Sequence, residues 1–396
     1  MYRAGFCLSA IVLSIVCSGG VADAQLRFRA DYLLWNRNND SNSSIITGTG
    51  GVSAGDTSFG YASGYQFTLG GSSNIFDVEA SFMSIPTGWS SSAGGTLTQP
   101  LVFDDPANAF VAPANGLGFV SALGVAAQTP GVEDNEIEFL EAGAQYQTHY
   151  TSQFNSFELN LGSSRTVRPV FFSLGWRHME LKESAAVLVR GNFQVRDSAT
   201  GTFPGGGGNL PNDQLSNAAL IAAGFTNTSG AADGFSGYDP TAVAPVITQM
   251  GISYKGAAFN DLDGMQLTVG GRYPVNDMFT MQGTLKGGVY QNYIRASVHE
   301  SVFGIVNDDS VYERTFRDST KTASFAGAIG LDAILALTDY VNFTLGYQAL
   351  FVTNMAFANA QTGGISTDLF GAAHYNLVSN GLLLAHGVNV GLEFWW

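Results

Sequence analysis

Cysteine is almost absent from this chain: Cys7 and Cys17 are the only two among 396 residues. Both lie within residues 1–24, which we expect to be a cleaved signal peptide. The mature chain would then have no thiol, no disulfide and no cysteine-based metal site. Secreted chains without cysteine are typical of proteins that cross an oxidising periplasm before they insert into a membrane. We therefore expect hydrogen bonds and packing alone to hold the fold.

The order of charged, apolar and small residues at the start of the chain indicates the signal peptide. Arg3 precedes an apolar stretch from Ala4 to Val16, which is too short for a spanning helix of about 20 residues. The small residues of Ala22-Asp23-Ala24 then form a cleavage site, which leaves residues 25–396 as one expected domain. A lipoprotein anchored at Cys17 is the alternative, but the preceding residues lack the leucine usual at such a site.

Charged residues and long apolar runs are also scarce. Charged side chains make up 12% of the chain, against about 25% in a typical soluble domain, so part of the surface is expected not to face water. After residue 24 no apolar run reaches the roughly 18 residues of a transmembrane helix, which excludes a helical membrane protein. The net charge of −15 argues against nucleic acid as a partner, because phosphates attract a basic surface.

What the sequence does contain is alternation of apolar and polar residues. Phe28, Ala30, Tyr32 and Leu34 are separated by polar residues, and strands place successive side chains on opposite faces. The same split recurs at about 58–69, 76–82, 156–161, 170–177, 265–273, 279–289, 324–335 and 341–351. A membrane-embedded barrel shows this period, with apolar residues outside and polar residues inside.

A water-soluble β-sandwich is the competing fold, because its strands alternate as well. Two features favour the barrel. The apolar rows are rich in Phe, Tyr and Trp, as expected of a lipid-facing band with aromatic girdles. The polar rows are rich in Gly, Ser and Thr, which suit a confined lumen better than a solvated surface.

Short and long connections follow one another in turn. The short ones lie at 71–74, 163–165, 274–276 and 338–339, and the long ones at about 37–57, 85–134, 196–245 and 354–381. Transmembrane barrels have short periplasmic turns and long external loops. We therefore predict an all-β, antiparallel up-and-down barrel with strands at about 26–36, 58–71, 74–84, 135–163, 168–195, 249–274, 277–303, 311–337, 340–353 and 382–396.

Ten strands is the predicted count, and twelve is the alternative if 85–134 or 196–245 hides a further hairpin. Several of the predicted strands are longer than the roughly 9–11 residues that cross a bilayer, so we expect them to project beyond it.

The last strand carries the most specific signal. Its apolar residues alternate up to an aromatic final residue, and they are Val388, Val390, Leu392, Phe394 and Trp396. Assembly by strand addition needs an exposed amphipathic strand of this kind. We interpret these residues as an assembly signal, with the barrel-assembly machinery and periplasmic chaperones as partners during insertion.

Several segments resemble a known family, and they lie on expected strands across nearly all of the mature chain. They are Arg29–Trp35, Ser156–Asn160, Leu174–Leu181, Gly264–Leu267, Leu345–Leu350 and His386–Trp396. They are similar to the β-barrel porins of planctomycete-type bacteria, and the Legionella-type pore-forming outer-membrane family is a second possible home. Two positions depart from the pattern: Asn36 replaces an expected aromatic, and the chain ends in Trp-Trp. The resemblance implies a pore and supplies no catalytic residues.

Charged residues on the inward rows are the candidate pore lining. They are Arg27, Arg29, Asp31, Asp77, Glu79, Glu158, Arg177, Arg272, Lys286, Asp332 and Glu393. Such residues set selectivity in an open pore. The alternative is that opposite charges on nearby strands pair and brace a narrow barrel, since a ten-stranded lumen is only slightly wider than one filled by side chains.

Signals for enzymatic or metal chemistry are weak. The five histidines show no metal-ligand spacing, and only His149 and His299 lie high on expected strands, where barrel hydrolases place catalytic groups. Acidic loop residues that would suit divalent cations are Asp104, Asp105, Glu133, Asp308 and Asp309, but a solvated surface is the default interpretation of them.

We therefore expect an outer-membrane barrel that is not an enzyme, has no cofactor and forms a passive pore for small hydrophilic solutes. The alternative is a closed structural or surface-interaction barrel that acts through its external loops, followed by an outer-membrane hydrolase. Outer-membrane lipid is the expected surrounding, and oligomerisation is left open because no sequence feature indicates it.

Overall fold

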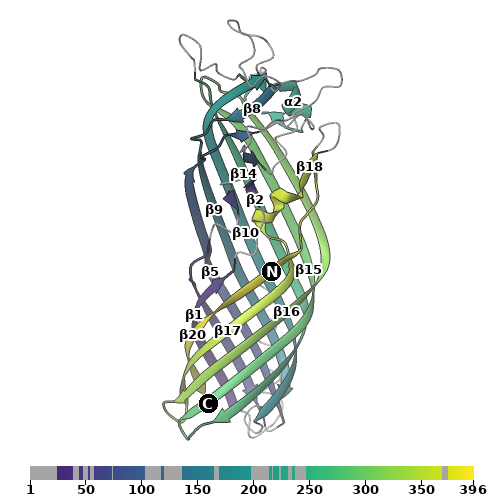
Figure 1. Ribbon diagram of the computed structural model, residues 1–396. Helices are drawn as coiled ribbons and strands as arrows, with labels where there is room; N and C mark the ends of the chain where they lie inside the picture. Colours follow the sequence, from purple (N-terminus) through teal and green to yellow (C-terminus); the bar gives the residue numbers. More distant parts are fainter. Residues whose placement is uncertain are drawn as a thin grey trace.

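Ten antiparallel strands form a closed barrel in the computed structural model (Figure 1). In order around the wall they are β1 (Gln25–Arg37), β4 (Ala62–Ser72), β5 (Phe76–Thr96), β9 (Gln145–Ser163), β10 (Val170–Asp197), β14 (Gln249–Pro274), β15 (Phe279–Val306), β16 (Val311–Ala336), β17 (Val341–Met355) and β20 (Gly381–Trp395). Pairing of the first strand with the last closes the ring, from Arg27 opposite Trp395 to Arg37 opposite Ala385. The predicted fold, with ten strands in up-and-down order, is confirmed.

The structure describes residues 25–38, 44–47, 52–53, 58–73, 75–102, 117–119, 136–164, 169–197, 214–215, 217–222, 224–230, 234–236, 247–367 and 373–396. The expected signal peptide and the candidate loop residues Asp104, Asp105 and Glu133 lie outside this set. Among the described residues, no helix combines the length and apolar character needed to span a membrane.

Short elements occupy the long connections. They are β2 (Ser44–Thr47), β3 (Val52–Ser53), β6 (Leu101–Val102), β7 (Leu117–Phe119), β8 (Glu136–Leu140), β11 (Gln214–Leu215), α2 (Asn217–Ala222), β12 (Thr226–Asn227), β13 (Phe235–Ser236), the 3₁₀-helix η3 (Ala358–Gly364), β18 (Ile365–Thr367) and β19 (Ala373–Tyr375). In the part of the chain that is described, none of them adds a strand to the closed wall, so the twelve-stranded alternative finds no support there.

Three predicted strand boundaries differ from the structure. The segment 135–163 is divided into β8 and β9 by a turn. The second strand begins at Ala62 rather than 58, and Phe59, expected on the outer face, is 5% exposed and packs inside. The third strand continues to Thr96 through a register shift, where Gly88 adopts a left-handed φ of 63° that favours glycine.

The short turns are stabilised by side chains that accept backbone hydrogen bonds. Asn276 Oδ1 accepts from the backbone N–H groups of Met278 at 2.9 Å and Phe279 at 2.8 Å. Thr338 Oγ1 accepts in the same way from Tyr340 at 3.2 Å and Val341 at 3.0 Å. Asn and Thr favour turns because they offer the chain this local bond. These residues fix the tight ends of two hairpins.

Outward-facing residues near the short turns form an apolar band. On β10, Val170, Phe172 and Leu174 are exposed, and on β14 the exposed residues include Met265 and Leu267. On β15 the band runs from 279 to 289, which matches the roughly 9–11 tilted residues that cross a bilayer. A closed wall with such a band is stable in hydrocarbon because every strand backbone is paired. The protein is therefore an outer-membrane barrel.

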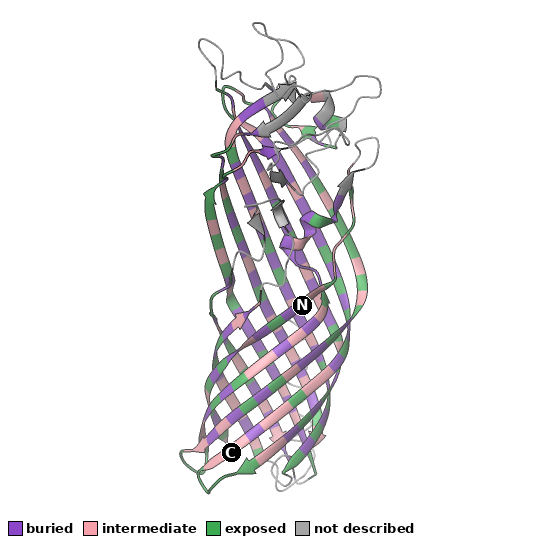
Figure 2. Ribbon diagram, viewed as in Figure 1, coloured by how far each residue is buried: buried purple, intermediate pink, exposed green. Residues whose placement is uncertain are grey.

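Above this band the pattern of the strands reverses, although buried and exposed residues still alternate (Figure 2). On β10 the outward residues after Trp176 include His178 and Lys182, whereas the inward Met179 and Leu181 are fully buried. The upper half thus presents a polar outer wall to water and an apolar interior. This half is the predicted projection beyond the membrane, which we call the extracellular half.

The wall is not equally tall all round. β10 and β15 have 28 residues each, whereas β1 has 13 and β17 has 15. Pairing between β16 and β17 reaches only Ala326 opposite Val352, while β16 continues up to Val311. The extracellular half is consequently a curved sheet of the longer strands (Figure 1), and residues from the long connections cover its concave face.

Candidate functional site

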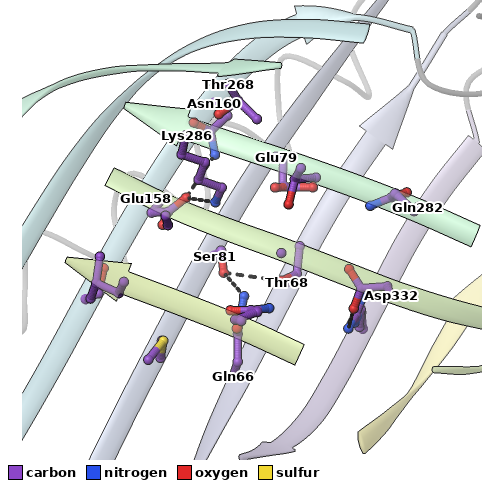
Figure 3. A pocket seen from close by; sticks show the side chains of 18 of the residues that line it. Gln66, Thr68, Glu79, Ser81, Glu158, Asn160, Thr268, Gln282, Lys286 and Asp332 are labelled. Atoms are coloured by element: carbon purple, nitrogen blue, oxygen red, sulfur yellow. Dashed lines mark hydrogen bonds and ion pairs between the residues drawn. The ribbon is translucent and has the colours of Figure 1, made fainter. Parts of the chain in front are cut away.

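The part of the lumen near the short turns holds a layer of paired charges (Figure 3). Arg27 on β1 bonds to Glu79 on β5, across the intervening β4, and lies 3.6 Å from Glu393 on β20. Both carboxylates are nearly buried, with 11% and 2% of their side-chain surface exposed. Arg27 therefore links its own strand, β1, to β5 on one side and to β20 on the other, across the β1–β20 pairing that closes the barrel.

A second group lies on the same layer. The guanidinium of Arg29 bonds to Asp31 at 2.8 Å and to Asp332 on β16 at 2.9 Å. Thr344 Oγ1 donates to Asp31 at 3.3 Å, and Asn389 Nδ2 donates to Asp332 at 3.1 Å. Because each carboxylate has both a cation and a neutral donor, the cost of taking it out of water is largely offset.

The third group is centred on Glu158 of β9. Lys286 Nζ donates to this carboxylate at 2.6 Å, Gln266 Nε2 donates at 3.0 Å, and Arg177 Nε lies 3.2 Å away. These partners come from β15, β14 and β10, so the group crosses the lumen instead of following one pair of strands. Figure 3 shows Lys286 reaching toward Glu158, from a strand that lies three places further around the wall.

The structure places all the candidate lining residues on the inner face of the lower barrel. Besides the three groups above, Asp77 accepts a hydrogen bond from Ser72, and Arg272 lies near enough to Glu393 to interact with it electrostatically. A cavity of about 100 Å³ is left among these side chains. Opposite charges in contact around so small a space can brace the wall, which is the alternative role stated for these residues.

The predicted assembly residues lie on the other face. Val388, Val390, Leu392 and Phe394 are 36–40% exposed on the outside of β20, and Trp396 follows the strand at 58% exposure. Trp396 exchanges backbone hydrogen bonds with Leu26, so the last strand is paired to its end.

Above the charged layer the lumen is filled by apolar side chains, which the polar-inside expectation missed. One cluster includes Trp35, Trp89, Phe154, Leu262 and Ile294, all at most 2% exposed. A second cluster, higher in the extracellular half, includes Val189, Phe193, Ile252, Val298 and Tyr312. The expectation that the inner face is polar throughout is therefore wrong for the upper barrel, where the outer face meets water and apolar residues turn inward.

A buried ion pair lies inside the lower of the two apolar clusters. Arg37 of β1 bonds to Glu183 of β10, and neither side chain is exposed. Glu183 also accepts from Tyr150 Oη at 2.6 Å and Ser152 Oγ at 3.0 Å. The guanidinium carbon lies 5.0 Å from the ring centre of Phe59, which explains why that residue packs inside.

The connection between β17 and β20 enters the lumen instead of remaining outside. Asn260 Nδ2 donates to Ala356 O at 2.8 Å, and Asn260 Oδ1 accepts from the backbone N–H of Ala356 at 2.9 Å. Glu183 accepts from Ala358 N at 3.1 Å, and Tyr254 Oη donates to Ala358 O at 3.1 Å. The following 3₁₀-helix packs against β10, β14 and β15 with most of its residues buried. We call residues 356–364 the lumen insert.

The candidate histidines lie on the outer wall and far apart. His149 on β9 bonds to Ser92 at 2.8 Å, whereas His299 on β15 bonds to Thr315 at 3.0 Å. Two strands, β10 and β14, separate them, so these two do not share a site. No sequence signal short of the strand register could have decided this.

Another histidine lies in a group that could hold a metal ion. His178, Asp261 and Asp263 offer ligand atoms within 4.8 Å of one another on the outside of β10 and β14. Asp263 follows His178 by 85 positions, so no spacing motif in the sequence indicates the group. The register of β10 and β14 brings its residues together. Asp308 and Asp309 lie in the short turn between β15 and β16, away from this group.

Comparison with known proteins finds likeness in fold alone. Neither a protein-family model nor a curated protein matches the sequence. The outer membrane protease OmpT from Escherichia coli aligns with 12% identity and a TM-score of 0.38, covering 95% of this chain and 98% of that one. The autotransporter NalP translocator domain from Neisseria meningitidis aligns with 10% identity and a TM-score of 0.31, covering 99% and 96%. The toluene transporter TodX from P. putida gives 8% identity and a TM-score of 0.24, covering 94% and 90%.

Proposed function

We propose that this protein is an outer-membrane barrel whose lumen is closed and which acts at the cell surface through its extracellular half. The lumen insert is the observation that carries the proposal. It lies across the lumen, bonded to strands of the wall, with apolar clusters packed around it. A permanently open pore needs a continuous polar path, and the apolar clusters interrupt one.

The outer wall supports a surface role. Above the apolar band the long strands carry charged and polar residues outward, so the extracellular half is stable in water without a partner. The long connections that follow β5 and β10 begin near the top of this half, which raises them well clear of the lipid. Loops on a rigid scaffold commonly carry binding functions. No enzymatic activity is part of the proposal.

Single-channel recording tests the closed lumen. The refolded protein in a planar bilayer should give no current steps, because the insert and the apolar clusters block ion passage. A variant in which Asn-Gly replaces residues 356–380 removes the insert together with Ala356, Phe357 and Ala358 of the lower apolar cluster, so it should admit ions more readily than the wild type. Its folding is checked by the mobility shift of unheated barrels on gels. Steady current steps from the wild-type protein would overturn the closed-barrel proposal.

A passive pore for small hydrophilic solutes is the second candidate. The charged layer around the 100 Å³ cavity favours it, because paired charges of this kind also line selective constrictions. The resemblance to planctomycete-type porins points in the same direction. In that case the wild-type protein conducts, and Lys286→Gln together with Arg27→Gln changes the ratio of cation to anion permeability. Unchanged selectivity in a conducting barrel would assign these residues to bracing alone.

A further inference from the structure

The outer wall carries a basic patch just above the apolar band. It consists of Arg295 on β15 with Arg317 and Lys321 on β16, all of them exposed and facing outward. The register pairs Arg295 with Ser319, and Tyr293 with Lys321. Opposite residues on one face of a sheet lie about 5 Å apart and diagonal ones about 7–8 Å apart. The three cations therefore lie within reach of one multivalent anion.

The cations of the patch make no ion pair in the described part of the chain. Their contacts are aromatic: the Arg295 guanidinium lies 4.5 Å from the ring of Phe259, and Lys321 Nζ lies 5.9 Å from the ring of Tyr293. Asp261 on β14 interacts electrostatically with Arg295, but its close contact, at 3.5 Å, is with His178. Arg295 and Lys321 are thus exposed but held against aromatic rings.

The height of the patch matches the polar part of the membrane. Val289 and Phe325 are the uppermost strongly exposed apolar residues of the band on these two strands, and they face each other in the register. Lys321 lies four residues above this pair, Arg295 six residues above it and Arg317 eight. With about 3.4 Å per residue and a strand tilt of about 40°, their backbones lie roughly 10–20 Å above the hydrocarbon, and the long side chains of Lys321 and Arg295 can extend down toward the headgroups. Tyr293 lies between them, and tyrosine is favoured at headgroup level.

We propose that the basic patch binds the phosphate groups of lipid headgroups in the outer leaflet. The patch continues the lipid-facing band upward, so a lipid whose acyl chains lie on Val289 and Phe325 places its headgroup against it. Arginine offers a planar fork that matches phosphate oxygens, and the hydroxyls of Ser319 and Tyr293 add neutral donors. This site lies outside the lumen, so the proposal does not depend on whether the barrel conducts ions.

Lipid binding to the purified barrel tests the site. The full chain in detergent micelles is titrated with lipid A, which carries two phosphates, and with the same lipid after enzymatic dephosphorylation; native mass spectrometry counts the bound lipid. Wild-type protein should prefer the phosphorylated lipid. The variant R295Q/K321Q should weaken that binding at least about tenfold, because two charge-assisted contacts are lost.

The matched control removes two exposed basic residues higher on the same wall. R190Q/K255Q loses the same charge on β10 and β14 but should bind lipid A as the wild type does. Equal binding by R295Q/K321Q would overturn the proposal, as would equal preference for the dephosphorylated lipid. Displacement of the lipid by millimolar inorganic phosphate would show a site for free anions instead, which also overturns it.

Discussion

Breaking the buried pair of Arg37 and Glu183 tests how the upper barrel is held together. Both side chains are fully buried, so Glu183→Gln leaves a guanidinium charge without a counter-charge. Removing one member of such a pair costs about 3–5 kcal/mol. The same change weakens the bonds that Glu183 accepts from Tyr150 at 2.6 Å and from Ala358 at 3.1 Å, so the lumen insert also loses an anchor.

The double variant R37M/E183Q should be less damaged than the two single changes together predict. Removing both charges leaves no unpaired ion, and Met fills much of the space among Phe59, Trp89 and Phe357. We expect the double variant to be more stable, by at least about 2 kcal/mol in free energy of unfolding, than the sum of the losses of the two single variants implies. Urea unfolding in detergent micelles, followed by tryptophan fluorescence to which the buried Trp35 and Trp89 contribute, measures this. Losses that add to within about 0.5 kcal/mol would refute the reasoning, because the two residues would then act independently.

Three further predictions concern the wall. Leu174→Arg, on the outer face within the apolar band, should lower the free energy of unfolding in a bilayer by about 2–4 kcal/mol. Ser184→Arg, on the same face above the band, should change it by less than about 0.5 kcal/mol. Equal effects of the two variants would place the membrane elsewhere. Gly175→Ala should lower the free energy of unfolding by about 1–3 kcal/mol, because the new Cβ would lie 1.9 Å from Asn160 Oδ1. Gly283→Ala should leave it unchanged in the same assay, because its Cβ would meet no atom within 4 Å. Phe394→Ser should lower the yield of barrel insertion into vesicles that contain the assembly machinery more than Phe82→Ser does. The two rings are similarly exposed, at 36% and 38%, so Phe82→Ser is the control. Equal yields would contradict the interpretation of the last strand as an assembly signal.

The lower barrel follows from its sequence because one rule governs it. From Val170 to Trp176 each second residue is apolar and faces outward, as the alternation predicts. The pairing of Arg27 with Glu79 is also within reach of the sequence, since a single strand separates them. The contact of Lys286 with Glu158 is not, because it crosses the lumen between strands that are not neighbours and depends on the register of three pairings.

The upper barrel is harder to predict because the alternation continues, but the apolar residues move from the outer row to the inner row. Met179 and Leu181 stand in the same row as Arg177, and only the change of surroundings from lipid to water turns that row apolar. The sequence does hold the signal, in the switch from Trp176 to His178 on the outer row. The lumen insert gave no such signal: its residues are small and uncharged, as in many external loops, and their burial depends on partners such as Asn260 and Glu183.

The unequal height of the wall has a consequence for the surface of the cell. From Arg314 to Thr322, β16 pairs with a neighbouring strand on one side only within the described chain, so the backbone of its other edge has no strand partner there. Open edges invite strands of other molecules, and proteins discourage this with charged side chains along the edge. Arg317, Asp318 and Lys321 all lie on this stretch. Arg317 and Lys321 thus discourage edge-to-edge strand pairing between copies of the protein, in addition to facing the lipid headgroups.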